Sequence, residues 1–158
     1  MLVKTKHFGE IDLADDKVLT FENGIMGFED CKKYAILFNN ENEEKPLISW
    51  LQSLDEPALA LPIINPLSVK NDYDPVVEDG LLVNLGELTD ENIAVFVTLT
   101  IPPDITKMTS NLKAPFIINA DTRKGCQVVV DNVDYPVKFP VYEQFRKMKE
   151  AKGDDDVC

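Results

Sequence analysis

The sequence predicts a mainly all-β protein, built as a single antiparallel β-barrel-like domain with a short C-terminal helix. Its apolar segments are short, rich in Val, Ile, Leu and Phe, and separated by turn-forming residues, which is typical of β-strands. No long helical pattern lies between these segments to supply the crossovers that parallel strands require. The length of 158 residues favours one domain that is large enough to bury an ordinary core.

Nine short strands are expected along the chain, each bounded by Gly, Pro, Asn or Asp residues that favour turns. They cover residues 2–8, 17–21, 34–38, 47–54, 58–64, 81–85, 93–100, 115–119 and 126–130. Two of them, at 58–64 and 93–100, contain consecutive apolar residues, so both of their faces are expected to be covered. Pro62 cannot donate a ladder hydrogen bond, which predicts an edge strand or a bulge there and is compatible with an incompletely closed barrel.

The C-terminal region has the pattern of a helix. Apolar residues recur there at the spacing of one helix face, with basic residues around the rest of the turn. These apolar residues are Val141, Tyr142, Phe145 and Met148. Residues 1–150 are therefore expected to form the single domain, and the small, acidic residues 151–158 predict a flexible tail.

The chain is strongly acidic, with 28 Asp and Glu residues against 16 Lys and Arg, a formal net charge of −12. Direct nucleic-acid binding is not expected, because phosphate contacts require a basic surface. The sign of the charge also argues against adsorption to anionic membrane lipids. Residues 41–104 hold 13 acids and two bases, so the negative charge is concentrated in the middle third. A basic or mixed-charge protein is the expected kind of partner.

The cysteines and the N-terminal sequence indicate a cytoplasmic protein. Cys31, Cys126 and Cys158 are odd in number and lack both C-x-x-C spacing and accompanying histidines, so we expect reduced thiols and no zinc site. The first residues lack the apolar core of a signal peptide. No stretch approaches the length of about 18 apolar residues that a membrane span requires.

No combination of residues predicts an enzyme. The single histidine, His7, lies in an expected strand, and no G-x-S-x-G motif supplies a nucleophile for it. Paired carboxylates such as those at 55–56 offer acid and base groups, but solvated surface acids are the commoner interpretation. A calcium loop counted from Asp72 fails because Val76 and Val77 occupy its fifth and sixth positions. Nucleotide-binding glycine loops are absent, so no cofactor is expected.

Residues 21–29 contain two glycines that bracket Ile25 and Met26. One interpretation is a tight turn between two strands, with Phe21 and Phe28 in the core. The other places Ile25 and Met26 at an exposed loop tip as an apolar contact, since Met adapts well to binding surfaces. The two interpretations are compatible.

Six stretches of the chain form an ordered set of motifs that extends over most of residues 1–137. They are residues 21–29, Trp50-Leu51-Gln52-Ser53, residues 59–66, Asp72-Tyr73, residues 111–119 and residues 125–130. Their order and spacing, rather than any single motif, resemble the flagellar assembly factor FliW family. The resemblance implies a compact antiparallel β-barrel-like domain, a bacterial cytoplasm and no enzymatic activity.

The resemblance also implies two protein partners, flagellin and the carbon storage regulator CsrA, a small basic RNA-binding homodimer. In the mechanism that it implies, the free protein binds CsrA and stops it repressing translation of the flagellin message. Cytoplasmic flagellin takes the protein away from CsrA, and export of flagellin releases it again. The acidic middle third is complementary to a basic regulator. The amphipathic helices of flagellin call instead for an apolar surface.

Carried over onto this sequence, the regulator surface is expected in the acidic loop that follows the Asn65-Pro66 turn. Its candidate residues are Asn65, Asp72, Tyr73, Asp74, Glu78 and Asp79. The alternative is a solvated acidic loop with Tyr73 anchored in the core. For flagellin the candidate residues are Ile25, Met26 and Phe28, which are expected to be exposed.

Two other functions stay open on the sequence. A dedicated flagellin secretion chaperone would bind flagellin without binding CsrA. A small-molecule-binding β-barrel would need convergent polar groups in its interior, and the sequence supplies none. On its own the protein is expected to be monomeric.

Overall fold

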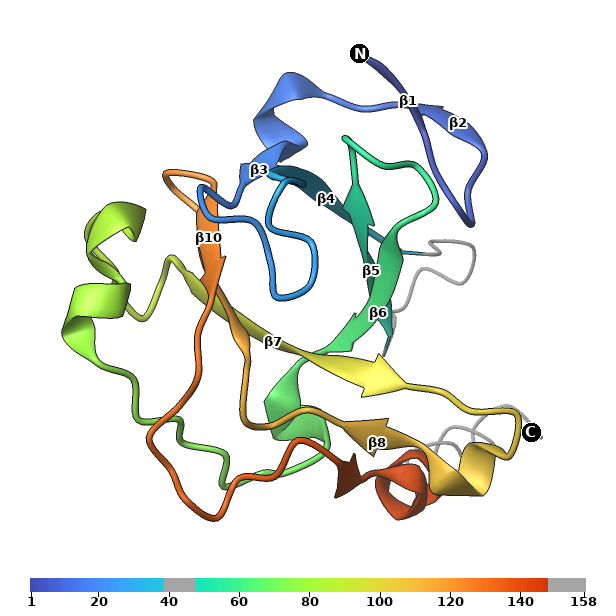
Figure 1. Ribbon diagram of the computed structural model, residues 1–158, viewed down its shortest axis with the longest axis vertical. Coiled ribbons are helices and arrows are strands. Elements are labelled where there is room, and N and C mark those ends of the chain that lie inside the picture. Colours follow the sequence, from blue (N-terminus) through green and yellow to red (C-terminus); the bar gives the residue numbers. More distant parts are fainter. Residues whose placement is uncertain (39–47, 148–158) are drawn as a thin grey trace.

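The computed structural model describes residues 1–38 and 48–147, and within these ranges the chain forms eleven strands, five 3-10 turns and a short helix (Figure 1). The strands are β1 (Leu2–Lys4), β2 (Glu10–Asp12), β3 (Leu19–Thr20), β4 (Lys33–Leu37), β5 (Ser49–Ser53), β6 (Ala60–Ile64), β7 (Ile93–Thr100), β8 (Thr109–Ser110), β9 (Phe116–Asn119), β10 (Lys124–Gln127) and β11 (Phe139–Pro140). The turns are η1 (Asp15–Lys17), η2 (Pro66–Ser68), η3 (Asp79–Leu81), η4 (Val83–Leu85) and η5 (Ile105–Lys107). The helix occupies residues 142–147.

Seven of these strands close into a barrel. Neighbouring strands follow the order β7-β6-β5-β4-β3-β10-β9, and β9 pairs again with β7 to complete the ring. The pairings are antiparallel except that β3 meets β10 in parallel, through Thr20 and Lys124. β8 and β11 extend the sheet beyond β7, and β1 and β2 form a separate hairpin (Figure 1). The predicted barrel-like, mainly all-β fold is confirmed.

The interior of the barrel is filled by side chains. Phe21, Tyr34, Leu51, Ile63 and Phe116 belong to one hydrophobic cluster, the barrel core, and are each 0–1% exposed. The ring of Phe21 meets those of Tyr34 and Phe116 edge to face, with centroids 5.2 and 6.0 Å apart. In a barrel of this size such side chains occupy the volume that an internal ligand would need.

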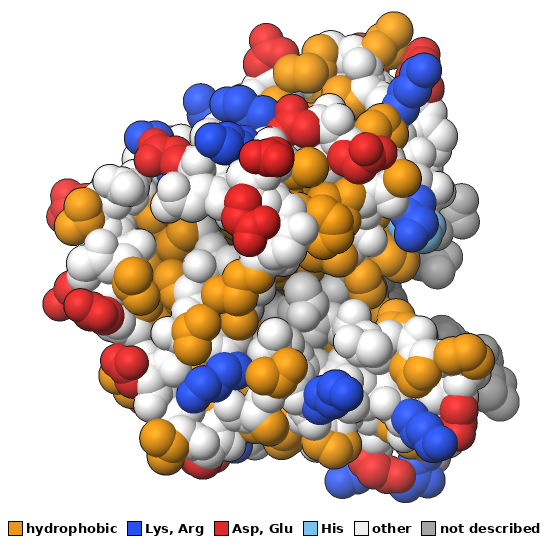
Figure 2. All heavy atoms as spheres, viewed as in Figure 1, with side chains coloured by type: hydrophobic (Ala, Val, Ile, Leu, Met, Phe, Trp, Pro, Cys, Tyr) orange, Lys and Arg blue, Asp and Glu red, His pale blue; other side chains and the backbone are white. Residues whose placement is uncertain are grey.

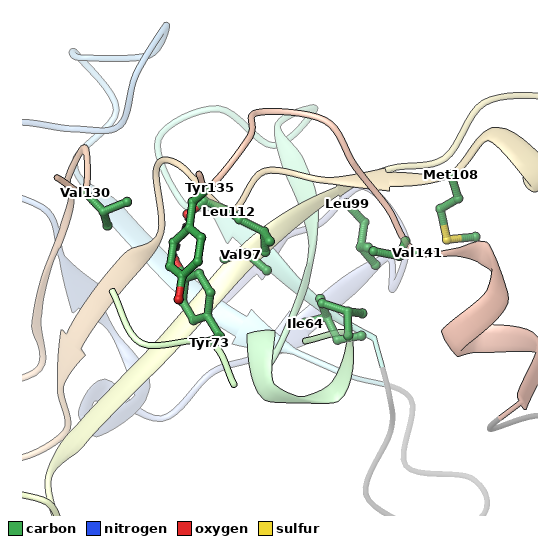
Figure 3. Packing of buried hydrophobic residues seen from close by; sticks show 10 residues of the cluster. Ile64, Tyr73, Val97, Leu99, Met108, Leu112, Val130, Tyr135 and Val141 are labelled. Atoms are coloured by element: carbon green, nitrogen blue, oxygen red, sulfur yellow. Dashed lines mark hydrogen bonds between the residues drawn. The ribbon is translucent and has the colours of Figure 1, made fainter. Parts of the chain in front are cut away.

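β7 is covered on both faces. Ala94 and Phe96 pack against the barrel core, whereas Val95, Val97 and Leu99 pack with a second hydrophobic cluster outside the barrel. Figure 3 shows this outer cluster, which gathers side chains from β6, β7 and the segments that flank β8, β10 and β11. The consecutive apolar residues of the strand predict two covered faces, and the structure confirms that prediction.

Two sequence-based expectations about strands are wrong. Residues 81–85 form η3 and η4 rather than a strand, because they pack through Leu85 on the outer face of β9 and β10, where no strand edge is free for pairing. The strand that contains Pro62 is not an edge, since β6 lies between β5 and β7. Its pairing with β7 begins only at Ile63, so the proline precedes that ladder. The barrel is closed by the pairing of β9 with β7, and not left open at β6.

The predicted C-terminal helix is present at residues 142–147. Val141, just before it, is fully buried, and Phe145 packs against the outer cluster. Met148 and the predicted tail at 151–158 lie outside the described residues. Among the helices at 1–38 and 48–147, none has the length and apolar character needed to cross a membrane.

Candidate partner-binding surfaces

The segment that follows β6 carries the acidic loop predicted to contact the regulator. It leaves the barrel at Asn65, whose side-chain oxygen accepts a hydrogen bond from the backbone N–H of Leu67 at 3.0 Å and so caps η2. Pro66 comes next, at a position in the first turn where a missing N–H is tolerated. Asn65 is exposed, but its side chain already shapes the start of the loop.

Tyr73 attaches the acidic loop to the outer cluster. Its side chain is 7% exposed, its hydroxyl donates to the carbonyl oxygen of Leu112 at 2.8 Å, and its ring stacks on that of Tyr135 with centroids 4.8 Å apart (Figure 3). Burial, with a smaller contribution from Tyr135, raises the pKa of the Tyr73 hydroxyl above its ordinary range. The structure therefore places Tyr73 as an internal anchor, with its ring inaccessible to a partner.

Asp72 and Asp74, on either side of Tyr73, are both exposed but differ in their surroundings. Asp72 Oδ1 lies 2.8 Å from Nζ of Lys70. The hydrogen bond from Lys70 holds the pKa of the Asp72 carboxyl below its usual range, and the same bond raises the pKa of Lys70. Asp74 forms no ion pair with any residue in the described part of the chain. Asp74 is thus the carboxylate of this loop whose charge is not shared with a lysine.

Hydrogen bonds hold the acidic loop against residues 131–135. The backbone N–H of Asp74 donates to the hydroxyl of Tyr135 at 2.7 Å. Asn132 bonds the loop twice, donating from Nδ2 to the Asp74 carbonyl oxygen at 3.1 Å and accepting at Oδ1 from the Val76 N–H at 2.6 Å. A loop fixed in this way loses little conformational freedom when a partner binds. Nothing in the sequence pattern points to Asn132.

The acidic surface continues beyond this loop. Glu78 and Asp79 are exposed at the start of η3. Residues 71–106 contain no Lys, Arg or His, and the nearest bases in the sequence are Lys70 and Lys107 at the two ends of the stretch. The acids of the stretch are Asp72, Asp74, Glu78, Asp79, Glu87, Asp90, Glu91 and Asp104. Figure 2 shows acidic side chains at its left edge, over η3 and η4. This base-free acidic stretch is the strongest local charge feature of the chain.

Apolar side chains are exposed within the same stretch. Val76, Leu81 and Val83 are 53%, 48% and 73% exposed. The exposure of Leu81 and Val83 was not expected from the sequence, because both residues fall in a segment predicted to be a strand, where alternate residues would be buried. The surface around η3 therefore offers both charge and apolar area to a partner.

The second candidate surface is the turn between β3 and β4, which lies across one end of the barrel in Figure 1. Ile25 and Phe28 pair across the turn, and Gly27 has a φ of 88°, as the third residue of a type II turn requires. The backbone N–H of Met26 donates to Oε1 of Gln127 at 2.8 Å, which ties the turn to the end of β10.

The turn exposes only part of the predicted flagellin contact. Ile25 is 3% exposed and belongs to the barrel core, so the prediction of its exposure is wrong, because the turn folds this side chain back into the barrel. Met26 and Phe28 are 50% and 42% exposed. The turn interpretation placed both phenylalanines in the core, but only Phe21 is buried there. Met26 and Phe28 remain as an exposed apolar pair.

Three titratable side chains have surroundings that bear on their reactivity, namely His7, Cys31 and Cys126. His7 stacks on Trp50 with ring centroids 4.0 Å apart. Cys31 and Cys126 are free thiols, and burial raises the pKa of the Cys126 thiol, which disfavours a reactive thiolate. Across residues 1–38 and 48–147, no three His, Cys, Asp or Glu side chains are grouped so that they could hold a metal ion.

Residues 2–141, which include both candidate surfaces, match the protein family described as FliW protein. The chain belongs to the FliW family. A FliW relative from Lachnoclostridium phytofermentans, named flagellar assembly factor FliW, is 60% identical over 158 residues, which is 100% of both chains. One of the same name from Thermotoga neapolitana is 42% identical over 150 residues, covering 94% of this chain and 98% of the relative.

The fold agrees with that of a solved FliW protein. A crystal structure of the flagellar assembly factor FliW has a TM-score of 0.81 and 30% identity to this chain, covering 89% of this chain and 96% of the other. The FliW resemblance read from the motifs is confirmed. The chain is accordingly a flagellar assembly factor, which is a non-catalytic role.

Proposed function

We propose that this FliW-family protein binds flagellin and, when free of flagellin, binds and antagonises the RNA-binding regulator CsrA. It does so in the bacterial cytoplasm, as a monomer, without contacting nucleic acid or membrane. Accumulating flagellin would occupy the protein and free CsrA to repress flagellin translation. Export of flagellin would reverse this, so that synthesis follows export.

The observation that carries the proposal is the base-free acidic stretch at 71–106, whose loop is exposed and already ordered. A small basic homodimer is electrostatically complementary to such a surface, which raises the association rate and makes binding sensitive to salt. Asp74, Glu78 and Asp79 are the proposed direct contacts, joined by Asp72 with its charge reduced by Lys70. Asn65 and Tyr73 act by shaping and anchoring the loop.

For flagellin, the proposed contact is the exposed pair Met26 and Phe28. An amphipathic helix of flagellin presents an apolar face that such a pair can bury. Met is suited to this role because its unbranched side chain adapts to the surface that it meets. The hydrogen bond from Met26 to Gln127 fixes the backbone from which both side chains project.

A flagellin chaperone without a regulatory partner is the second candidate function. The exposed apolar pair at the turn supports it as well as it supports the first proposal, and only CsrA binding separates the two. A small-molecule-binding barrel is disfavoured, because the interior is occupied by side chains such as Phe21 and Phe116.

The test is fluorescence anisotropy of a labelled flagellin leader RNA bound to CsrA. Adding this protein is expected to lower the anisotropy as RNA is released, and adding flagellin afterwards is expected to restore it. Absence of RNA release, in a sample that binds flagellin, would leave the chaperone function as the better description.

A charge-matched pair of variants identifies the surface in the same assay. Asp74→Lys is expected to weaken RNA release. Glu10→Lys makes the same change in net charge on the separate β1–β2 hairpin and is expected to behave like the unmodified protein. Equal effects of the two variants would show that net charge, and not this loop, controls the interaction.

A further inference from the structure

A cavity of about 460 Å³ lies outside the barrel, where η1, β3, the start of β4 and the β9–β10 turn meet. Its lining combines the apolar side chains of Val18 and Leu54 with the cationic side chains of Lys33 and Arg123. Figure 2 shows Lys and Arg side chains gathered at the upper left, over β3 and this turn. Neither candidate partner surface includes this cavity.

Lys33 and Arg123 line the cavity, and the described residues do not neutralise their charges. Lys33 Nζ donates to the hydroxyl of Thr20 at 2.8 Å, which orients the ammonium group without offsetting its charge. Neither Lys33 nor Arg123 forms an ion pair within residues 1–38 and 48–147. Asp55 also lines the cavity, but its Oδ2 accepts hydrogen bonds from two backbone N–H groups, those of residues 32 and 33, at 2.7 and 3.0 Å.

Arg123 occupies a backbone conformation that arginine rarely adopts. Its φ is 58°, and no other non-glycine residue in the described ranges has a positive φ. Its N–H donates to the Asn119 carbonyl oxygen at 2.8 Å, and its own carbonyl oxygen accepts from the N–H of Thr20 at 2.9 Å. Glycine or asparagine would satisfy this turn with less strain. A non-glycine residue in this strained conformation at the wall of a cavity points to a role for that residue.

We propose that this cavity binds a monocarboxylate on an apolar stem, with Arg123 and Lys33 holding the carboxylate and Val18 and Leu54 contacting the stem. An arginine fork suits a planar carboxylate, and the nearby ammonium adds a second charge-assisted hydrogen bond. A cavity of this volume is within the range of small-ligand sites, about 300–1,000 Å³.

The acids of the lining restrict the class of anion. Asp15 and Asp55 both line the cavity, so a dianionic phosphate or a polyanion would meet two carboxylates as well as two cations. A single carboxylate is the anion that the two cations can hold against that repulsion. Because the cationic side chains are exposed, binding is expected to be weak and to decrease with added salt.

The proposal is tested by nuclear magnetic resonance titration of the ¹⁵N-labelled full chain at low salt. N-acetyl-leucine supplies a carboxylate on an apolar stem as a peptide C-terminus would, isovalerate supplies the same groups as a free acid, and N-acetyl-leucinamide lacks the carboxylate. Both acids are expected to give saturable shifts at the amides of Thr20 and Arg123, and the amide is expected to give none. Saturation by N-acetyl-leucine alone would identify a peptide terminus as the source.

Variants separate this site from a general effect of charge. Arg123→Asn keeps a residue suited to positive φ and is expected to weaken binding at least about fivefold. Lys124→Asn removes the same charge from the next residue, which does not line the cavity, and is expected to change binding less than twofold. Lys33→Met provides a second loss of binding should Arg123→Asn unfold the turn. Shifts from the amide equal to those from the acids, equal binding by inorganic phosphate, or unaltered binding in both cavity variants would overturn the proposal.

Discussion

Replacement of Tyr73 by Phe removes one hydroxyl from the acidic loop and leaves every exposed acid in place. In the structure this hydroxyl donates to the Leu112 carbonyl oxygen at 2.8 Å, and Leu112 is fully buried. A buried acceptor that loses its donor costs about 1–2 kcal/mol. In a chain of 158 residues each kcal/mol lowers Tm by about 2–4 °C, so Tyr73→Phe is expected to lower Tm by about 2–8 °C.

Tyr34→Phe is the matched control for this change. Tyr34 is also fully buried, but its hydroxyl forms no hydrogen bond with a described residue. Removing a buried hydroxyl without a protein partner relieves a desolvation cost. Tyr34→Phe is therefore expected to leave Tm unchanged or to raise it. Differential scanning calorimetry of the two variants measures how much the hydrogen bond from Tyr73 to Leu112 contributes to stability.

Tyr73→Phe also shows whether Tyr73 anchors the loop or contacts the partner directly. If Tyr73 supports the loop from inside, CsrA affinity measured well below Tm is expected to stay within about twofold of the unmodified protein. A large loss of affinity together with an unchanged Tm would refute the reasoning, because it would mean that the hydroxyl meets the partner and not Leu112.

Four other predictions concern the surfaces and the barrel. Asp74→Lys is expected to weaken CsrA binding by about fivefold at low salt, and Asp72→Lys is expected to weaken it less, because Lys70 already offsets the charge of Asp72. The variant that carries both substitutions is expected to have nearly the Tm of the unmodified protein. Equal losses of affinity for the two single variants in isothermal titration calorimetry would contradict the role given to Lys70. Lys70→Met is expected to raise the pKa of Asp72 toward its ordinary value, as followed by carboxyl carbon resonances. The pair of Lys70 and Asp72 contributes to stability above the ordinary carboxyl pKa, and this contribution is lost as pH falls through the lowered pKa of Asp72. The stability of Lys70→Met is therefore expected to depend less on pH in that range. Met26→Asp is expected to reduce flagellin binding in pull-down at unchanged Tm; intact binding would remove this turn from the interface. Gly125→Ala would place a Cβ 2.8 Å from the Phe21 ring and is expected to destabilise the barrel by about 1–3 kcal/mol in urea titration, with a neutral result showing that the core can yield.

The sequence was sufficient to predict the barrel-like fold, and its longest strand shows why, because apolar residues occupy both of its faces. Residues 93–97 are apolar in succession, and in the structure residues 94–97 alternate between the barrel core and the outer cluster. Strands β2, β8 and β11 are too short for a period of two to appear, at two or three residues each. β11 in addition pairs only with β8, a strand that is distant from it in the sequence.

Residues 81–85 show where local pattern fails. The segment has the composition of a buried strand, but a strand also needs a free edge, and the closure of β7 onto β9 removes it. The segment instead buries Leu85 and exposes its neighbours Leu81 and Val83. Sequence composition reports which residues avoid water, whereas the availability of an edge is a property of the whole sheet.

The candidate surfaces were predicted in outline and corrected in detail. Charge indicated the acidic middle third of the chain, and the family resemblance narrowed the regulator surface to the loop after Asn65 and Pro66. The burial of Ile25 and Tyr73 was not visible, since an apolar or aromatic residue in a loop reads equally well as an anchor or as a contact. Only the fold shows that one packs into the barrel core and the other into the outer cluster.

The two proposed surfaces are attached to opposite faces of one strand. The acidic loop packs through Tyr73 on the outer cluster, the turn packs through Ile25 on the barrel core, and β7 contributes alternate residues to both. Close-packed interiors transmit small displacements because they contain few voids that could absorb them. β7 therefore connects the packing of the turn with the packing of the acidic loop. Because the two proposed surfaces consist of different residues, the proposed exchange of partners does not require both partners to contact the same residues.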